Sequence, residues 1–175
     1  MVTGPLDQVS AESHSPDGQI TATLTGRDQV RLRFQRGAYR RYDEGDLGHQ
    51  LSQLATRTWV DYQRKAFAAL SEEIGQTVRG DERSDSQKAT RYHDALAAAT
   101  ARGTSEDGWI EITSTGLVRW RVRVYGGACT RLREEEFLAE AGSALADLLE
   151  DFYEQRRALR ETILGEAPEN PIDEG

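Results

Sequence analysis

The chain contains the hexapeptide Ser15-Pro16-Asp17-Gly18-Gln19-Ile20 and, 90 positions further on, a second version of it, Ser105-Glu106-Asp107-Gly108-Trp109-Ile110. The correspondence continues without a gap, so that residues 15–70 align with residues 105–160 and share 15 of 56 positions. The shared positions include turn glycines and alternating arginines, among them Gly26 and Gly116, Arg31 and Arg121, and Arg33 and Arg123. Two copies are too few for a stacked solenoid. We therefore expect a single-chain pseudo-dimer with an approximate two-fold axis.

Each copy predicts a three-stranded antiparallel meander. The Asp-Gly pair is a tight-turn signal, because aspartate bonds to the backbone and glycine accepts positive φ. After a first strand at residues 9–13 or 102–104, the next strand is expected at 20–24 or 110–113. The third strand alternates most clearly, as Val30-Arg31-Leu32-Arg33-Phe34 and Trp120-Arg121-Val122-Arg123-Val124. One face of each sheet should therefore be apolar and the other should carry a row of guanidinium groups.

A long amphipathic helix is expected after each sheet. Acidic residues at 43–46 and 134–136 suit the positive end of a helix dipole. Apolar residues then recur at helical spacing, and the second helix runs to about Leu164. A further helix over residues 86–101, closed by Gly103 in the C′ position, precedes the second copy. The first copy has no equivalent leading helix.

The predicted fold class is thus α+β, with two tandem units. Unit 1 covers residues 8–72 and unit 2 covers residues 86–164. The polar segment 73–85 lacks apolar periodicity and is expected to be a linker. The acidic, proline-containing tail 165–175 is expected to be disordered.

Composition limits the class of protein. Hydrophobic residues are 37% of the chain and charged residues 30%, which is polar for a globular protein. No apolar stretch approaches the ~20 residues of a membrane helix, and residues 1–7 do not resemble a signal peptide. We therefore expect a soluble, cytoplasmic protein with no membrane contact. The single cysteine, Cys129, is expected to be a packing residue, and the three histidines are scattered, so neither a metal nor another cofactor is expected.

The order of elements resembles that of the YbaB/EbfC family. Residues 92–164 resemble the family over its whole length, and residues 9–70 resemble it without the leading helix. The segments Ser15-Pro16-Asp17-Gly18-Gln19-Ile20-Thr21-Ala22-Thr23 and Arg36-Gly37-Ala38-Tyr39-Arg40-Arg41 look like those of actinobacterial members. The resemblance implies a nucleoid-associated protein that dimerises and binds DNA with low sequence preference. Similar folds also occur among accessory proteins of actinobacterial type VII (ESX) secretion. The two copies would supply both halves of such a dimer, and further homodimerisation stays open.

Positive charge is concentrated in the same element of both copies, although the net charge is -8 at pH 7. Residues 27–41 carry six arginines and one aspartate, and residues 117–133 carry five arginines and no acid. The first hypothesis is that these arginines contact the phosphates of duplex DNA. The candidate residues are Arg31, Arg33, Arg36, Arg40, Arg41, Arg119, Arg121, Arg123, Arg131 and Arg133. The alternative is structural, with the guanidinium groups paired to glutamates of neighbouring helices.

The second hypothesis is a protein-interaction adaptor or chaperone-like accessory protein, with a secretion substrate as one possible partner. Trp109, Phe152 and Leu159 are its candidate contact residues, because large apolar side chains dominate interface energetics. Trp120 is in phase with Val122 and is expected in the core. The chain is not expected to be an enzyme, since it lacks a nucleophile elbow, a Walker loop and a metal-ligand pair on a helix.

Overall fold

The computed structural model of the chain describes residues 4–26, 28–74 and 87–165. The first copy comprises the 3-10 turn η1 (Pro5–Gln8), the strands β1 (Ser10–His14), β2 (Ile20–Thr25) and β3 (Gln29–Phe34), the turn η2 (Tyr39–Arg41) and the helix α1 (Glu44–Ile74). The second copy comprises the helix α2 (Gln87–Ala98), the strands β4 (Thr100–Thr104), β5 (Ile110–Thr115) and β6 (Arg119–Val124), the short helix α3 (Ala128–Arg131), the helix α4 (Glu134–Leu159) and the π-helical turn η3 (Arg160–Leu164). The predicted α+β class is confirmed, with two three-stranded sheets that are each followed by a helix.

Both sheets are antiparallel meanders, in the orders β1-β2-β3 and β4-β5-β6. Their registers are equivalent, because Thr23 pairs with Arg31 and Thr113 pairs with Arg121. Gly18 and Gly108 have φ values of 73° and 78° in the matching turns, a conformation that glycine adopts without strain. The first strand of each copy differs slightly from its predicted range: β1 is shifted by one residue to 10–14, and β4 begins two residues earlier, at residue 100.

Gly103 does not close a helix, and the prediction that it does is wrong. The helix α2 ends at Ala98, and Gly103 lies inside β4. A Cβ atom on Gly103 would lie 2.1 Å from the carbonyl oxygen of Ala144 and 2.4 Å from the backbone nitrogen of Leu148. Only glycine therefore allows the backbone of α4 to approach this strand so closely.

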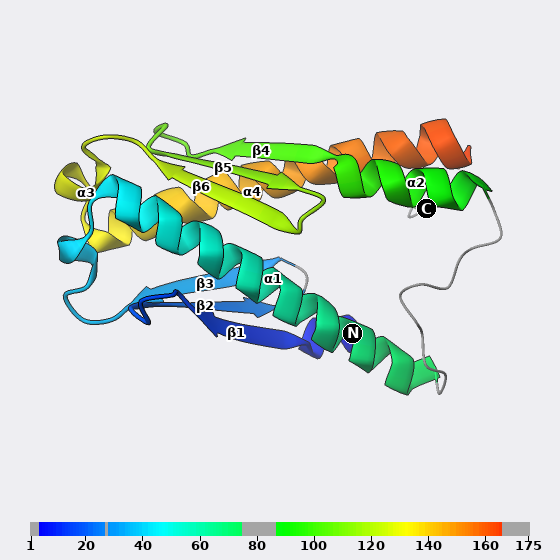
Figure 1. Cartoon of the computed structure of the whole chain (residues 1–175), viewed down its shortest axis with the longest axis horizontal. Helices are drawn as coiled ribbons and strands as arrows, with labels where there is room; N and C mark the ends of the chain where they lie inside the picture. Colours follow the sequence, from blue (N-terminus) through cyan, green and yellow to red (C-terminus); the bar gives the residue numbers. More distant parts are fainter. Residues whose placement is uncertain (1–3, 27, 75–86, 166–175) are drawn as a thin grey trace, which may run out of the picture.

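The molecule has two layers, and each layer contains the sheet of one copy and the long helix of the other. In Figure 1, α1 crosses in front of β1, β2 and β3, whereas α4 runs behind β4, β5 and β6. Each helix packs on the apolar face of its own sheet, and α1 also lies along β6 of the other sheet. One layer thus holds α1 beside the second sheet, and the other holds α4 beside the first sheet.

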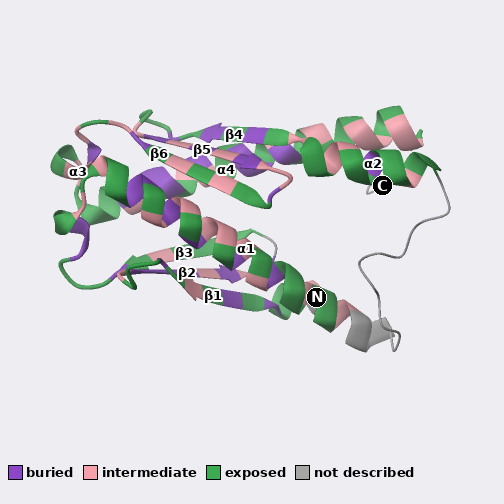
Figure 2. Cartoon of the chain, in the orientation of Figure 1, coloured by how far each residue is buried: buried purple, intermediate pink, exposed green. Residues whose placement is uncertain are grey.

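One hydrophobic core spans both copies. Figure 2 shows buried residues along β2, β4, β5 and α1. The largest fully buried apolar side chains come in equal number from the two halves, and all belong to one cluster. They are Ile20, Leu47 and Leu54 from the first copy and Ile110, Phe137 and Leu148 from the second.

An aromatic cluster joins the copies at one end of the molecule. The Phe137 ring of α4 lies 6.0 Å from the Phe34 ring and 5.3 Å from the Tyr39 ring, measured between centroids. The Tyr39 hydroxyl donates a hydrogen bond to the carbonyl oxygen of Leu132 at 3.0 Å. Burial of these rings, with the tyrosine hydroxyl satisfied, stabilises the contact between the halves.

The far end of α4 lies beside α2 (Figure 1). Tyr92 of α2 is buried. This contact accounts for the part of the second helix that extends beyond its sheet. The helix α1 continues to Ile74, two residues into the segment predicted as a linker. The rest of that linker and residues 166–175 of the predicted disordered tail lie outside the described residues.

Candidate binding surfaces

The outer face of the second sheet, on the side away from α4, is strongly basic. Its residues follow from the strand register: Thr100, Thr115 and Arg119 form one row, Arg102, Thr113 and Arg121 a second, and Thr104, Glu111 and Arg123 a third. The face therefore presents four arginines against one glutamate, with threonine hydroxyls between them. Hydrogen bonds from Arg102 and Tyr125 hold the pKa of Glu111 below its usual value, with Arg102 the larger contribution.

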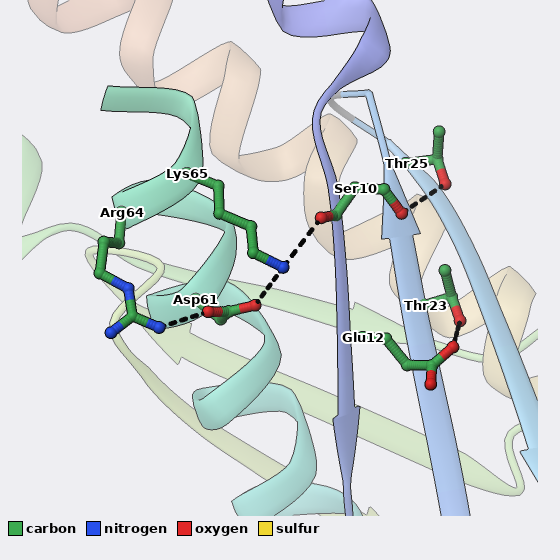
Figure 3. Close-up of polar contacts among 7 residues, drawn as sticks. All are labelled: Ser10, Glu12, Thr23, Thr25, Asp61, Arg64 and Lys65. Atoms are coloured by element: carbon green, nitrogen blue, oxygen red, sulfur yellow. Dashed lines mark hydrogen bonds and ion pairs between the residues drawn. The ribbon is translucent and has the colours of Figure 1, made fainter. Parts of the chain in front are cut away.

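The outer face of the first sheet is equivalent in place but less basic. Its rows are Ser10, Thr25 and Gln29, then Glu12, Thr23 and Arg31, then His14, Thr21 and Arg33. Figure 3 shows two of its polar contacts: the Thr23 hydroxyl lies 3.4 Å from a Glu12 carboxylate oxygen, and the Ser10 and Thr25 hydroxyls lie 3.5 Å apart. Two arginines against one glutamate leave this face a weaker attractor of anions.

Most of the predicted phosphate contacts are exposed and unpartnered. Within the described residues, the side chains of six of the ten arginines have no ion pair, hydrogen bond or ring contact: Arg31, Arg33, Arg36, Arg40, Arg119 and Arg121. The other four are engaged: Arg41 donates to Gln19, Arg123 lies 5.0 Å from the Tyr125 ring centroid, Arg131 lies 6.0 Å from the Trp109 ring centroid, and Arg133 pairs with Glu136 at 2.6 Å. Pairing with a helix glutamate, the structural alternative, therefore applies to Arg133 alone among these ten.

The two arginine rows point to opposite sides of the molecule. Each row lies on the face of its sheet that is turned away from the helix of the same copy. Since α1 lies in front of the first sheet and α4 behind the second, the outer face of the second sheet is turned toward the viewer in Figure 1 and that of the first sheet away. One straight duplex cannot lie across both faces at once.

The predicted protein contacts are less available than the arginines. Phe152 is 5% exposed and belongs to the core, so it presents no surface to a partner. Trp109 is half-buried against the core, and Leu159 is half-buried near the end of α4. Trp120 is half-buried rather than fully enclosed, with its indole N–H donating to the Leu117 carbonyl at 2.9 Å.

Three of the four sheet edges are covered by polar groups from the helices. On β1, Lys65 of α1 donates to the Ser10 carbonyl at 3.2 Å, and Arg57 donates to the His14 carbonyl at 3.3 Å. Figure 3 shows how Asp61 holds Lys65 over this edge, with 3.1 Å between the charged atoms. A covered edge cannot pair with another strand.

The edges β4 and β6 are covered by α4 and α1. Three side chains of α4 form hydrogen bonds with the backbone of β4. Asp151 accepts from the Arg102 N–H and Asp147 from the Thr104 N–H, both at 2.9 Å. Gln155 donates to the Thr100 carbonyl at 3.0 Å. On β6, the Val122 N–H donates to Ser52 Oγ of α1 at 2.8 Å. Gly48 makes room for this contact, because a Cβ there would lie 2.9 Å from the Val122 carbonyl oxygen.

The edge of β3 has no such cover within the described residues. The residue of β3 that aligns with Val122 is Leu32. Backbone groups of an edge strand point alternately toward the sheet and away from it, so Val30, Leu32 and Phe34 direct their N–H and C=O groups outward. The helix α4 should cover them by symmetry, but Leu138 replaces Gly48 and Gly142 replaces Ser52. The bulkier residue keeps α4 away, and the glycine has no hydroxyl to offer.

A groove of about 1220 Å³ lies between β3 and α4. Arg31, Arg33 and Leu32 line its strand side, and Leu138, Leu145, Leu149 and Tyr153 are among the residues on its helix side. Behind it, Leu32, Leu145 and Leu149 also line an apolar cavity of about 100 Å³ between the two copies. Trp59 reaches the same cavity, and its buried Nε1–H has no acceptor among the described residues. An equivalent but smaller groove of about 840 Å³ lies between α1 and β6 and is lined by Ser52, Arg121 and Val122 among others. On that side Trp59 and Trp120 are in ring contact, at 6.1 Å between centroids, and the aligned residues on the β3 side are Leu149 and Val30.

Comparison with known proteins gives no match: no family model, no curated protein and no solved structure is similar to this chain. The resemblance to YbaB/EbfC proteins therefore stays a hypothesis. No helix among the described residues is long and apolar enough to cross a bilayer. Within those same residues, no three histidine, cysteine or acidic side chains gather into a group that could hold a metal ion.

Sequence reasoning found the arginine rows but not the groove. The rows repeat identically in both copies, and a period of two places them on one face. The groove depends instead on positions where the copies differ, such as Ser52 and Gly142. Those differences are visible in the alignment, but only the structure shows that α1 reaches the other sheet through them.

Proposed function

We propose that the chain binds duplex DNA through the outer faces of its two sheets, by phosphate contacts that do not read base sequence. The observation that carries this proposal is the row of exposed arginines without partners, Arg119 and Arg121 on one face and Arg31 and Arg33 on the other. Unpaired guanidinium groups in a polar setting bind phosphate bidentately and release counterions. Strands rather than a helix present these groups, which favours contact with the backbone over reading of bases in the major groove.

The acidity of the whole chain does not oppose this proposal. The net charge is -8, yet the outer face of the second sheet carries four arginines and one glutamate, and that glutamate is engaged by Arg102 and Tyr125. At physiological ionic strength charges act over about 8 Å, so a bound phosphate responds to the local face more than to distant helices. The resemblance to nucleoid-associated proteins points the same way.

The test is binding to random-sequence duplex DNA at several salt concentrations. The variant Arg31→Gln, Arg33→Gln, Arg121→Gln, Arg123→Gln should lose binding while its urea unfolding stays unchanged. A matched control removes the same charge from exposed helix positions by changing Arg64, Lys88, Arg91 and Arg156 to glutamine. Equal loss in both variants would mean that net charge, and not the sheet faces, governs binding.

Two opposed faces should also bridge two duplexes. Donor-labelled and acceptor-labelled DNA should show energy transfer in the presence of the protein, and a variant of either face alone should bind DNA without bridging it. The variant of the second sheet should weaken binding more, because that face carries more arginines. Bridging that persists in both single-face variants would contradict this arrangement.

A second candidate function is protein adaptation. The observation that favours it is the groove between β3 and α4, since a strand edge without cover beside apolar side chains is the kind of surface to which proteins attach extended segments. Two of the exposed large hydrophobic side chains, Val30 and Tyr153, line this groove.

A further inference from the structure

We propose that the groove between β3 and α4 binds an extended segment of a partner protein as a fourth strand of the first sheet, with apolar side chains alternating with acidic ones. The proposal rests on the second candidate function, protein adaptation, and does not depend on DNA binding. The edge itself provides the first part of the case. Val30 and Leu32 direct backbone groups into the groove, and within the described residues nothing satisfies them, whereas β1, β4 and β6 are each covered by side chains.

An added strand would satisfy the uncovered edge of β3. Strands pair at about 4.8 Å, and each new backbone hydrogen bond needs only main-chain atoms from the partner. The groove of about 1220 Å³ runs from α4 past β3 and onto the outer face of the first sheet, where Thr21 and Thr23 also line it, so an added strand would lie at its α4 side. A helical partner would bring no free N–H or C=O groups to this edge, so an extended segment is favoured over a helix.

Alternation of side chains then fixes the chemistry of the segment. Side chains on the inner face of an added strand would continue the row of Val30 and Leu32 toward the apolar cavity of about 100 Å³, which is large enough for an aliphatic side chain. Side chains on the outer face would continue the row of Arg31 and Arg33, which have no partners in the described part of the chain. Carboxylates at these positions would pair with the guanidinium groups.

The groove is also polarised along its length, which orients the segment. At the edge of the second sheet, Ser52 of α1 contacts Val122 of β6. The aligned residues are Gly142 of α4 and Leu32 of β3, so Leu32 and its neighbour Arg33 lie at the end of the groove that Leu138 and Gly142 line. Asp28 and Glu150 lie toward the other end, where Glu154 and Arg157 of α4 also line the groove, so that end carries three acidic groups against one arginine. The acidic part of the segment should thus lie beside the arginines and not beside Asp28.

The edge can be tested with one substitution. Val30→Pro removes an outward N–H, and proline is tolerated on an edge strand where that N–H does not serve the sheet. The probe is a short fluorescein-labelled peptide in which valine and glutamate alternate, measured by anisotropy against the full chain. Binding should weaken about tenfold in Val30→Pro, as expected for loss of a backbone hydrogen bond in a partly buried groove, and should weaken less in Val30→Ala, which trims the side chain but keeps the N–H. Urea unfolding of both variants checks that the sheet is intact.

Two further experiments test the charge of the bound segment and the distance between α4 and β3. A peptide that alternates valine and lysine should bind more weakly than the glutamate peptide, and Arg31→Gln with Arg33→Gln should remove that preference. The double variant Leu138→Gly, Gly142→Ser copies the residues with which α1 covers β6, and it should reduce binding by letting α4 approach β3.

Several outcomes would overturn the proposal. They are absence of peptide binding, binding that ignores Val30→Pro, and equal affinity for the lysine peptide. Sedimentation of the protein alone tests whether a second copy of the chain binds this edge instead. Dimerisation that disappears in Val30→Pro would show that it does. DNA binding measured on the same variants separates this proposal from the first function, because Val30→Pro should leave it intact.

Discussion

Ser52 Oγ lies 2.8 Å from the backbone nitrogen of Val122 and accepts its hydrogen bond, which joins helix α1 of the first copy to the outer strand of the second. The same hydroxyl donates to the Gly48 carbonyl oxygen at 2.6 Å, so one side chain serves both the helix and the sheet. The aligned position in the second copy is Gly142, which has no hydroxyl. Two aligned pairs, Gly48 with Leu138 and Ser52 with Gly142, thus distinguish the covered edge β6 from the uncovered edge β3.

Ser52→Ala should therefore lower the free energy of unfolding by about 1–2 kcal/mol, because it leaves a half-buried backbone N–H without an acceptor. Urea unfolding measures this. The control is Thr56→Ala one turn further along α1, where the hydroxyl bonds only to the Ser52 carbonyl oxygen of the same helix at 3.0 Å. Equal losses in the two variants would mean that the contact with Val122 adds nothing.

Gly103→Ala should be more damaging. The added methyl group would overlap the backbone of α4 at Ala144 and Leu148, and neither strand nor helix can yield without losing contact. We expect a loss of about 2–3 kcal/mol in the free energy of unfolding, as for other overpacked sites.

Gly142→Ala is the matched control for that substitution. Gly142 is exposed on α4, and a Cβ there would meet nothing within 4 Å. The change should stabilise the protein by about 0.5–1 kcal/mol, because alanine favours a helix interior over glycine. A neutral Gly103→Ala would show that β4 and α4 can move apart.

These glycines show where sequence reasoning reaches its limit. The meanders were predictable because their signals are local: an Asp-Gly turn, a period of two, and a glycine between strands. Gly103 was misassigned because a glycine after an apolar segment suits a helix end as well as a strand that another backbone approaches. Only the position of α4, which is distant in sequence, shows that Gly103 belongs to a strand and does not end a helix.

The same distinction holds for the candidate surfaces. Exposure of Arg31 and Arg121 followed from alternation along one strand. Phe152 was predicted as an interface residue because it is large and apolar, yet it lies on the same helical stripe as Phe137 and Leu148 and is buried in the core. The local sequence does not distinguish an apolar residue that packs on a sheet from one that is exposed and binds a partner protein.

Glu44 should make stability depend on pH at the junction of the copies. One of its carboxylate oxygens accepts from the Gly127 N–H at 2.9 Å and the Cys129 N–H at 3.2 Å. Hydrogen bonds from its own backbone N–H, from Cys129 and from Gly127 hold the pKa of Glu44 below its usual value. Its contribution is therefore complete above the ordinary glutamate pKa of about 4.3 and is lost as the pH falls through the lower folded value.

Glu44→Gln should consequently lower Tm at neutral pH, and the difference from the wild type should shrink below about pH 4. Thermal unfolding between acidic and neutral pH measures it. The repeat supplies the control, because Glu134 occupies the aligned position and is exposed. Glu134→Gln should change the Tm profile less than Glu44→Gln does, and an equal effect in both variants would contradict the role given to Glu44.

Cys129 should be a slow nucleophile. Burial raises the pKa of its thiol to about 11, with further contributions from the carboxylates of Glu44 and Asp43. At pH 8 only about one thiol in a thousand would then be ionised, against about a quarter of an ordinary cysteine thiol with pKa near 8.5. Since the thiolate is the reactive form, alkylation by iodoacetamide should be roughly a few hundredfold slower in the native protein than in urea. Glu44→Gln should accelerate native alkylation, because it removes a negative charge that opposes ionisation. Fast native alkylation that is indifferent to Glu44→Gln would mean that the junction around α3 opens often enough to expose the thiol.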